Sequence, residues 1–232
     1  MLGPFQYGVW ALCTLLEAAV VVCALARHSF RRYLLLNVYM ASSCLVNLAR
    51  YQILNHYGFS SSEYVYFYYY SDALLTIALY FALMNLYSRV FEELNFERYV
   101  RIGALLLLSG TALFSYAVVQ GSTSRLLGHF VVELCQNLFF IGLVLTYLLW
   151  GAILKLRDTR ARLIQMVLSL GIFFSAFAAN YSLRNLYPSL HVPLTYLLQF
   201  MGLMLPLAWL YAFWRLPEEA RLATSRLAVI PR

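Results

Sequence analysis

Charged side chains are scarce in this chain of 232 residues: they make up only 12% of it, whereas 62% of the residues are hydrophobic and 17% are aromatic. Soluble domains carry about 25% charged residues, and a soluble fold of this size could not cover so much apolar surface. A soluble enzyme or nucleic-acid-binding domain is therefore excluded, and we expect an integral membrane protein. The formal net charge is +7, and we expect the excess Lys and Arg side chains to interact with anionic lipid head groups.

Paired cysteines and long polar connections are also missing. Four cysteines, Cys13, Cys23, Cys44 and Cys135, each fall inside an apolar stretch and lack metal-type spacing, so they are typical of small packing residues and not of a disulfide framework. The connections between apolar stretches are about six to ten residues long, which leaves no room for a soluble domain on either side.

Seven apolar stretches account for nearly the whole chain. They cover about 5–26, 33–54, 64–88, 99–118, 127–154, 163–183 and 193–214. Each is close to the roughly 20 residues that an α-helix needs to cross a bilayer core. The sequence therefore predicts an all-α integral membrane protein, with a bundle of seven transmembrane helices over residues 1–216.

Arginine and lysine alternate between crowded and nearly empty connections. Fourteen of the 17 fall after the first, third, fifth and seventh stretches, and three, Arg50, Arg125 and Arg184, fall on the other side. Because cytoplasmic loops are enriched in Lys and Arg, we expect the N-terminus outside and the C-terminus in the cytoplasm. Arginine outnumbers lysine sixteen to one, which fits a GC-rich genome and favours a bacterial inner membrane.

Residues 217–232 form a short basic tail. Pro217, Glu218 and Glu219 are typical of a helix start, and the leucines and arginines that follow favour an amphipathic helix on the cytoplasmic membrane surface. A frayed tail is the alternative.

The order of the stretches suggests a three-plus-one-plus-three parallel repeat. The central stretch has no acidic, basic or histidine side chain over 102–118, and a shift of 130 residues pairs Arg32 with Arg162 and Tyr51 with Tyr181. Such a repeat is common in transporters, although apolar segments also align by chance.

Three acidic residues, Glu17, Asp72 and Glu133, fall inside apolar stretches, where an ionised side chain costs about 2.5–3.5 kcal/mol. Helical spacing places Asp72 and Glu133 on polar stripes that should face the bundle interior. We therefore predict a polar pocket in the outer half that binds a small ligand or ion through Asp72, Glu133, Arg50, Arg184, His129, Asn180, Asn137, Tyr68 and Gln199. The alternative is that Arg50 and Arg184 form static ion pairs with the two acids.

Glu17 lies halfway through the first stretch and is our candidate for a proton or cation site. The competing interpretation is a neutral acid that hydrogen-bonds to a neighbouring helix.

Three histidines, His56, His129 and His191, fall on the outer side, but they lack paired spacing such as HxxxH. Zinc could use three imidazoles, yet scattered interfacial histidines usually bond head groups or water. We therefore predict no metal and no other cofactor.

The topology resembles that of microbial rhodopsins and of the large receptor class, but the motifs are missing. The single lysine, Lys155, lies in a connection, so retinal cannot attach to the seventh helix. The third stretch ends without the receptor Asp/Glu-Arg-Tyr signature, the HxxxH of ceramidase-type hydrolases is absent, and so are the Pro-Gln motifs of three-plus-one-plus-three carriers. No family is identified from these motifs.

Three classes of function remain open. The leading hypothesis is a non-enzymatic sensor, receptor-like module or membrane-complex subunit, which acts with other membrane proteins or as a homo-oligomer. The second is a proton- or cation-coupled secondary transporter, and the third is a metal-dependent membrane enzyme.

Overall fold

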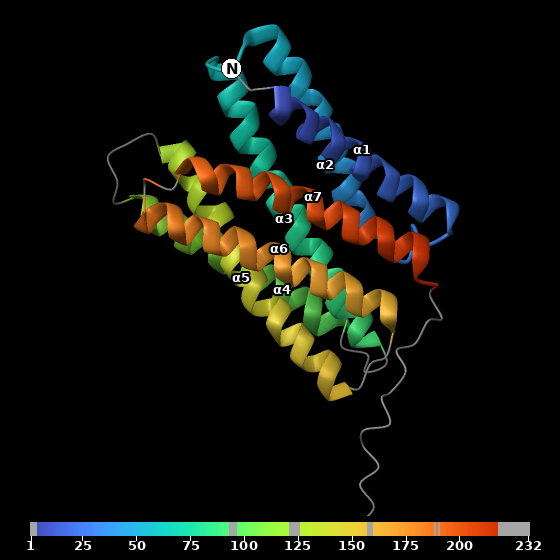
Figure 1. Ribbon diagram of the computed structural model, residues 1–232. Coiled ribbons are helices and arrows are strands. Elements are labelled where there is room, and N and C mark those ends of the chain that lie inside the picture. Colours follow the sequence, from blue (N-terminus) through green and yellow to red (C-terminus); the bar gives the residue numbers. More distant parts are fainter. Residues whose placement is uncertain are drawn as a thin grey trace, which may run out of the picture.

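The computed structural model describes residues 4–92, 97–120, 126–156, 160–187, 189 and 191–217. Within that part of the chain it contains seven α-helices and no β-strand (Figure 1). The helices are α1 (Pro4–Ala26), α2 (Leu34–Tyr57), α3 (Ser62–Val90), α4 (Glu97–Gln120), α5 (Leu126–Leu156), α6 (Ala161–Leu186) and α7 (His191–Arg215). The all-helical class is therefore confirmed. The predicted tail helix lies outside the described residues.

Six of the seven helices, all except α2, are long and apolar enough to cross a membrane. A helix in a bilayer satisfies its backbone hydrogen bonds internally, so an apolar helix of this length needs no other polar partner. The described helices thus indicate an integral membrane protein.

The helix α2 is more polar than its neighbours. Asn37 and Ser43 are buried on it, and it also carries Asn47 and Arg50. It packs between α1 and α3, so these polar groups can face protein rather than lipid. Gly58, at a φ of 83°, ends α2 with its N–H bonded to the carbonyl of Leu54, a left-handed backbone position that favours glycine.

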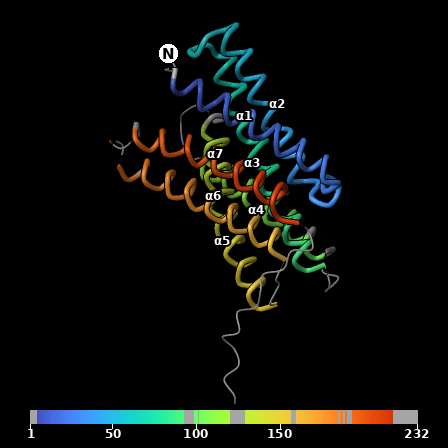
Figure 2. The backbone as a smooth tube through the Cα atoms, turned by 45° about the vertical axis from the view of Figure 1, so that its right-hand side comes forward, coloured from blue at the N-terminus to red at the C-terminus, as the bar shows by residue number. Residues whose placement is uncertain are grey.

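Six helices form a closed ring in the order α1, α2, α3, α5, α6 and α7, in which each helix packs against the next and α7 packs against α1. The helix α4 lies outside this ring, where it packs mainly against α5. Although α1 and α7 are at opposite ends of the chain, they lie side by side and run in the same direction (Figures 1 and 2). The ring therefore places the first and last of the described helices next to each other.

Small residues allow α5 and α6 to approach closely. A β-carbon added at Gly142 would lie 2.4 Å from the Phe174 ring, and one at Gly171 would lie 3.0 Å from Thr146. Glycine at a helix–helix contact is how membrane helices gain van der Waals packing. Phe139 stacks on Phe177 at 4.8 Å beside this contact.

Arginines tie the connections together at one end of the bundle, which we call the arginine end. Arg162 is only 5% exposed and donates to the Leu216 carbonyl after α7 and to Ser29 after α1. Arg27 donates to the Trp214 carbonyl, and Arg89 donates to the Arg32 carbonyl. Cations at helix C-termini satisfy carbonyls that have no partner within the helix.

Candidate ligand-binding site

A cavity of about 620 Å³ lies between α1, α2, α3 and α7, at the end of the bundle opposite the arginine end. Its volume is within the range of about 300–1,000 Å³ that is typical of small-ligand pockets. The polar side chains on its wall include Asn47, Arg50, Thr195 and Gln199, and the aromatic ones include Trp10, Tyr64 and Tyr68. Three of the predicted ligand-binding residues, Arg50, Tyr68 and Gln199, therefore line one cavity.

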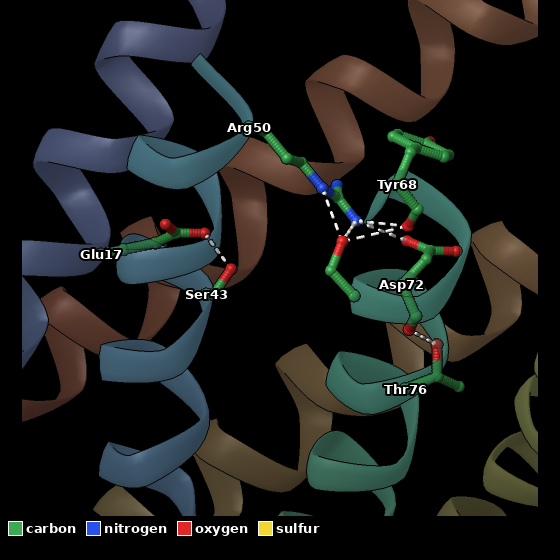
Figure 3. Close-up of polar contacts among 7 residues, drawn as sticks. Glu17, Ser43, Arg50, Tyr68, Asp72 and Thr76 are labelled. Atoms are coloured by element: carbon green, nitrogen blue, oxygen red, sulfur yellow. Dashed lines mark hydrogen bonds and ion pairs between the residues drawn. The ribbon is translucent and has the colours of Figure 1, made fainter. Parts of the chain in front are cut away.

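Arg50 is held against α3 by several contacts (Figure 3). Its Nε and Nη2 donate to Ser71 Oγ at 3.0 and 2.7 Å, and Nη2 also donates to the Tyr68 carbonyl at 3.1 Å. Nη2 forms an ion pair with Asp72 at 3.6 Å, and the guanidinium lies 4.3 Å from the centre of the Tyr68 ring. The ion pair and the cation–π contact offset the cost of removing this charge from water.

One nitrogen of Arg50 is left for a ligand. Within the described part of the chain, Nη1 donates no hydrogen bond, while Nε and Nη2 are both occupied. Because Arg50 lines the cavity, Nη1 can bind an acceptor there.

Two buried polar atoms, one on α7 and one on α6, lack partners in the described residues. Gln199 Oε1 is buried and has no hydrogen-bond partner in the described residues, and the same is true of Arg184 Nε. Arg184 Nη2 donates to Thr195 Oγ1 at 2.9 Å, and Thr195 lines the cavity. An unsatisfied buried polar atom costs about 1–3 kcal/mol, so a donor from a ligand at Gln199 would be favourable.

Glu17 lies behind the cavity wall. It is 5% exposed, its Oε1 lies 2.6 Å from Ser43 Oγ, and its Oε2 accepts from Asn47 Nδ2 at 2.9 Å. Cys13 Sγ lies 3.7 Å from Oε1, and both Cys13 and Asn47 line the cavity. Two lining side chains thus connect the cavity with the buried carboxyl group.

This site can hold Glu17 in either protonation state. The Asn47 amide nitrogen can only donate, so Oε2 is an acceptor, whereas the Ser43 hydroxyl can donate or accept. Ser43 can therefore donate to an ionised Oε1 or accept from a protonated one with the same heavy-atom positions. The predicted hydrogen bond to a neighbouring helix is present, and it is compatible with a proton site.

The predicted stripe on α5 does not reach this cavity. Asn137 donates to Ser115 of α4 at 3.0 Å, and neither Glu133 nor His129 lines the cavity. The expected ion pair between Arg184 and Glu133 is not present among the described residues, since Arg184 bonds to Thr195 instead. The physical reason is that α4 packs outside the ring against α5, so part of the polar surface of α5 meets α4.

Asn180 has a structural contact. It is 2% exposed and its Nδ2 donates to the Leu194 carbonyl at 2.9 Å, which joins α6 to α7. It is not part of the cavity wall.

The three histidines of the metal alternative are not assembled in the part of the chain that the structure describes. His56 and His129 are exposed, and the side chain of His191 lies outside the described residues. No group of three or more His, Cys, Asp or Glu that could hold a metal occurs among the residues with described positions.

Sequence reasoning missed three residues of the site. Trp10 and Cys13 belong to an apolar stretch and look like packing residues, and Ser71 is a small residue beside Asp72. A usable signal was the four-residue spacing of Cys13 and Glu17, which places both on one face of α1. Comparisons of this chain with known protein families, characterised proteins and solved structures found no match.

Proposed function

We propose that this membrane protein binds a small ligand in the cavity between α1, α2, α3 and α7, and that it acts as a receptor-like module. The observation that carries the proposal is Gln199 Oε1, which is buried and has no partner among the described residues, and Gln199 lines the same cavity as Arg50. An unpaired buried carbonyl oxygen costs about 1–3 kcal/mol, and a hydrogen-bond donor on a ligand would remove this cost.

The wall indicates the chemistry of the ligand. Gln199 Oε1 requires a donor, Arg50 Nη1 requires an acceptor, and Trp10 and Tyr64 offer apolar surface. Arg50 is already paired with Asp72, so the site does not demand a net anionic ligand. A molecule with a hydroxyl or amide group on an apolar body fits these requirements.

The proposed topology places the cavity in the outer half of the bilayer. The bias of arginines supports an N-terminus outside and an arginine end in the cytoplasm, where Arg27 and Arg89 can also meet anionic lipids. In this arrangement α2 crosses the membrane between α1 and α3, with its polar groups facing protein. The host membrane that we propose is a bacterial plasma membrane, where the module acts alone, as a homo-oligomer or within a larger membrane complex.

Filling the cavity tests the proposal. Gly202 lines it, and a β-carbon at Gly202 would meet nothing within 4 Å, so Gly202→Phe can occupy the space without a backbone clash. Gly110 on α4 also has open space around it, which makes Gly110→Phe the matched control. We expect native mass spectrometry to detect a small molecule on the wild type and on Gly110→Phe, and to find it lost from Gly202→Phe. Equal retention by both variants would contradict the proposal.

A second candidate is a proton- or cation-coupled transporter. It is favoured by Glu17, whose partner Ser43 suits both protonation states, and by the ring order, in which α1–α2–α3 and α5–α6–α7 have equivalent neighbours. The test is proton uptake in proteoliposomes, where Glu17→Gln should abolish uptake and Glu133→Gln, away from the cavity, should not. Unchanged uptake in Glu17→Gln would exclude Glu17 as the coupling site.

A further inference from the structure

A second hollow lies on the outside of the helix ring. It is a groove of about 860 Å³ that is lined only by α1, α2 and the connection after α2. We call it the α1–α2 groove. Leu15 and Leu48, on its two sides, are 67% and 51% exposed. No residue of α3 or α7 contributes to its lining. The groove therefore lies on the outer surface of the ring, which faces lipid, and not on the ring interior.

The α1–α2 groove and the cavity share their boundary. Trp10, Asn47 and Phe59 line both hollows. Val9 and Cys13 on α1 line only the cavity, whereas Ala11 and Thr14 line only the groove. Trp10 and Asn47 therefore stand in the seam between the two helices, with lipid on one side and the cavity on the other.

The seam between α1 and α2 is held by hydrogen bonds near Glu17 and by aromatic packing nearer the cavity end. Ser43, Cys44 and Asn47 of α2 bond to Glu17 or to the Thr14 carbonyl of α1. Toward the cavity end, aromatic side chains of the two helices meet. The recorded contact there is the edge-to-face packing of Trp10 on Tyr51 at 6.0 Å. Aromatic side chains can change rotamer without breaking a helix hydrogen bond.

We infer that the ligand of the cavity is a membrane amphiphile that enters sideways from the lipid between α1 and α2. This inference rests on the proposed ligand-binding function. The head group occupies the cavity, where Arg50 Nη1 donates a hydrogen bond to it and Gln199 Oε1 accepts one from it. The apolar chain passes Trp10 and lies in the α1–α2 groove, whose wall is mostly apolar with Asn47 and Asn55 as its amides.

The energetics favour this route over one through water. The groove wall carries large apolar side chains at a surface that faces lipid, and an acyl chain there loses no hydrophobic stabilisation on leaving the bilayer. The polar head group exchanges its hydration at the membrane interface for hydrogen bonds with the unpaired atoms of the cavity, which offset its desolvation.

The test uses a photoreactive residue inside the cavity. We place p-benzoylphenylalanine at Val9, which lines the cavity but not the groove, and reconstitute the full chain in vesicles of phosphatidylethanolamine and phosphatidylglycerol with tritium-labelled acyl chains. A second protein carries the same residue at Leu106, which is 69% exposed on α4, as the lipid-facing reference. After illumination, we expect labelled lipid on both proteins.

Closing the groove provides the decisive comparison. Ala11 lines only the groove and is exposed, so Ala11→Trp fills the route without touching the cavity wall, and Ala179→Trp on the exposed face of α6 is the matched control. We expect Ala11→Trp to remove the label at position 9 and to leave the label at position 106, while Ala179→Trp changes neither.

Each failure has a separate meaning. If position 9 takes no lipid in the wild type, or if Ala11→Trp leaves its label unchanged, the lateral route is wrong. The proposed function is judged by the small molecule that Gly202→Phe displaces. If that molecule is still bound and displaced while position 9 takes no lipid, then the cavity binds a ligand that comes from water.

Discussion

Asn47 joins the candidate cavity to the buried carboxyl group of Glu17. Its amide donates to Glu17 Oε2 at 2.9 Å, and the same side chain lines both the cavity and the α1–α2 groove. A ligand that displaces Asn47 therefore takes a hydrogen bond away from a carboxyl group that is 5% exposed. This contact is the shortest physical link between events in the cavity and the packing of α1 on α2.

The role of Glu17 in that packing can be separated from its charge. In Glu17→Gln the amide oxygen can still accept from Asn47 and the nitrogen can donate to Ser43, so we expect stability close to that of the wild type. Glu17→Ala removes the partner of the buried Ser43 hydroxyl and of the Asn47 amide, which should lower the free energy of unfolding by about 1–3 kcal/mol. Thermal unfolding in detergent measures both variants. A Glu17→Ala protein as stable as the wild type would show that the contacts are not formed.

The Arg50–Asp72 pair should respond unequally to the loss of its two partners. Asp72 is 36% exposed, and Arg50 keeps Ser71 and the Tyr68 carbonyl as acceptors without it. We expect Asp72→Asn to cost about 0.5–1 kcal/mol, as for a partly exposed ion pair. Arg50→Leu removes the hydrogen bonds as well and should cost about 2–3 kcal/mol.

The same unfolding assay gives the comparison, with Glu92→Gln as a control for an exposed pair at the other end of the bundle. Equal losses for Asp72→Asn and Arg50→Leu would mean that the ion pair, and not the contacts with Ser71 and Tyr68, holds the arginine.

The Arg50–Asp72 pair expected from the sequence is formed, whereas the Arg184–Glu133 pair is not formed among the described residues. Arg50 and Asp72 belong to consecutive helices joined by a short connection, and such helices are usually neighbours. For Glu133, the outcome depends on which neighbour covers each face of α5. Helical periodicity shows that Asn137 and Glu133 share a face, but it does not show that α4 packs outside the ring and offers Ser115 to that face.

The position of the cavity was likewise only partly accessible from sequence. Polar side chains such as Gln199 are visible as exceptions in an apolar stretch. Trp10 and Cys13 carry no such signal, because aromatic and small apolar residues are common in any membrane helix. Their role follows from the seam between α1 and α2, and the rotation of one helix against another is set by packing of both surfaces.

Close packing of α5 on α6 gives a prediction that does not depend on function. Gly142→Ala would place a β-carbon 2.4 Å from the Phe174 ring, and overpacking of this kind costs about 1–3 kcal/mol. Gly110→Ala meets open space and should be neutral or slightly stabilising, since alanine is the better helix former by about 1 kcal/mol. Unfolding midpoints of the two variants are compared directly. Adding Phe174→Leu to Gly142→Ala should recover part of the loss, and no recovery would place the strain elsewhere.

The arginine end should depend on Arg162 more than on Arg27. Arg162 is buried and bonds to the Leu216 carbonyl and to Ser29, whereas Arg27 is exposed and its bond to the Trp214 carbonyl is 3.3 Å long. We expect Arg162→Leu to lower the free energy of unfolding by about 2–3 kcal/mol, because it removes the hydrogen bonds of a buried guanidinium to the Leu216 carbonyl and to Ser29. Arg27→Leu should cost less than about 1 kcal/mol. A reversed order would show that charge alone, and not the hydrogen bonds, stabilises this end.

Cys13 allows the cavity and the proposed topology to be tested together. Its side chain is partly exposed and lines the cavity, while Cys23 and Cys135 are buried. In a Cys44→Ala background, a membrane-impermeant maleimide should therefore label Cys13 from the outer face of sealed vesicles. Gly202→Phe should slow the labelling because it fills the cavity, and Gly110→Phe should not.

Replacement of the target residue identifies the labelled thiol, since Cys13→Ser should abolish the reaction and leave the fold intact. Labelling that occurs only from the cytoplasmic face would reverse the proposed orientation. Labelling that is equally fast in Gly202→Phe would mean that the reagent reaches Cys13 by another path, because a phenylalanine side chain at position 202 would stand next to this thiol, whose sulfur lies 3.8 Å from the Gly202 carbonyl.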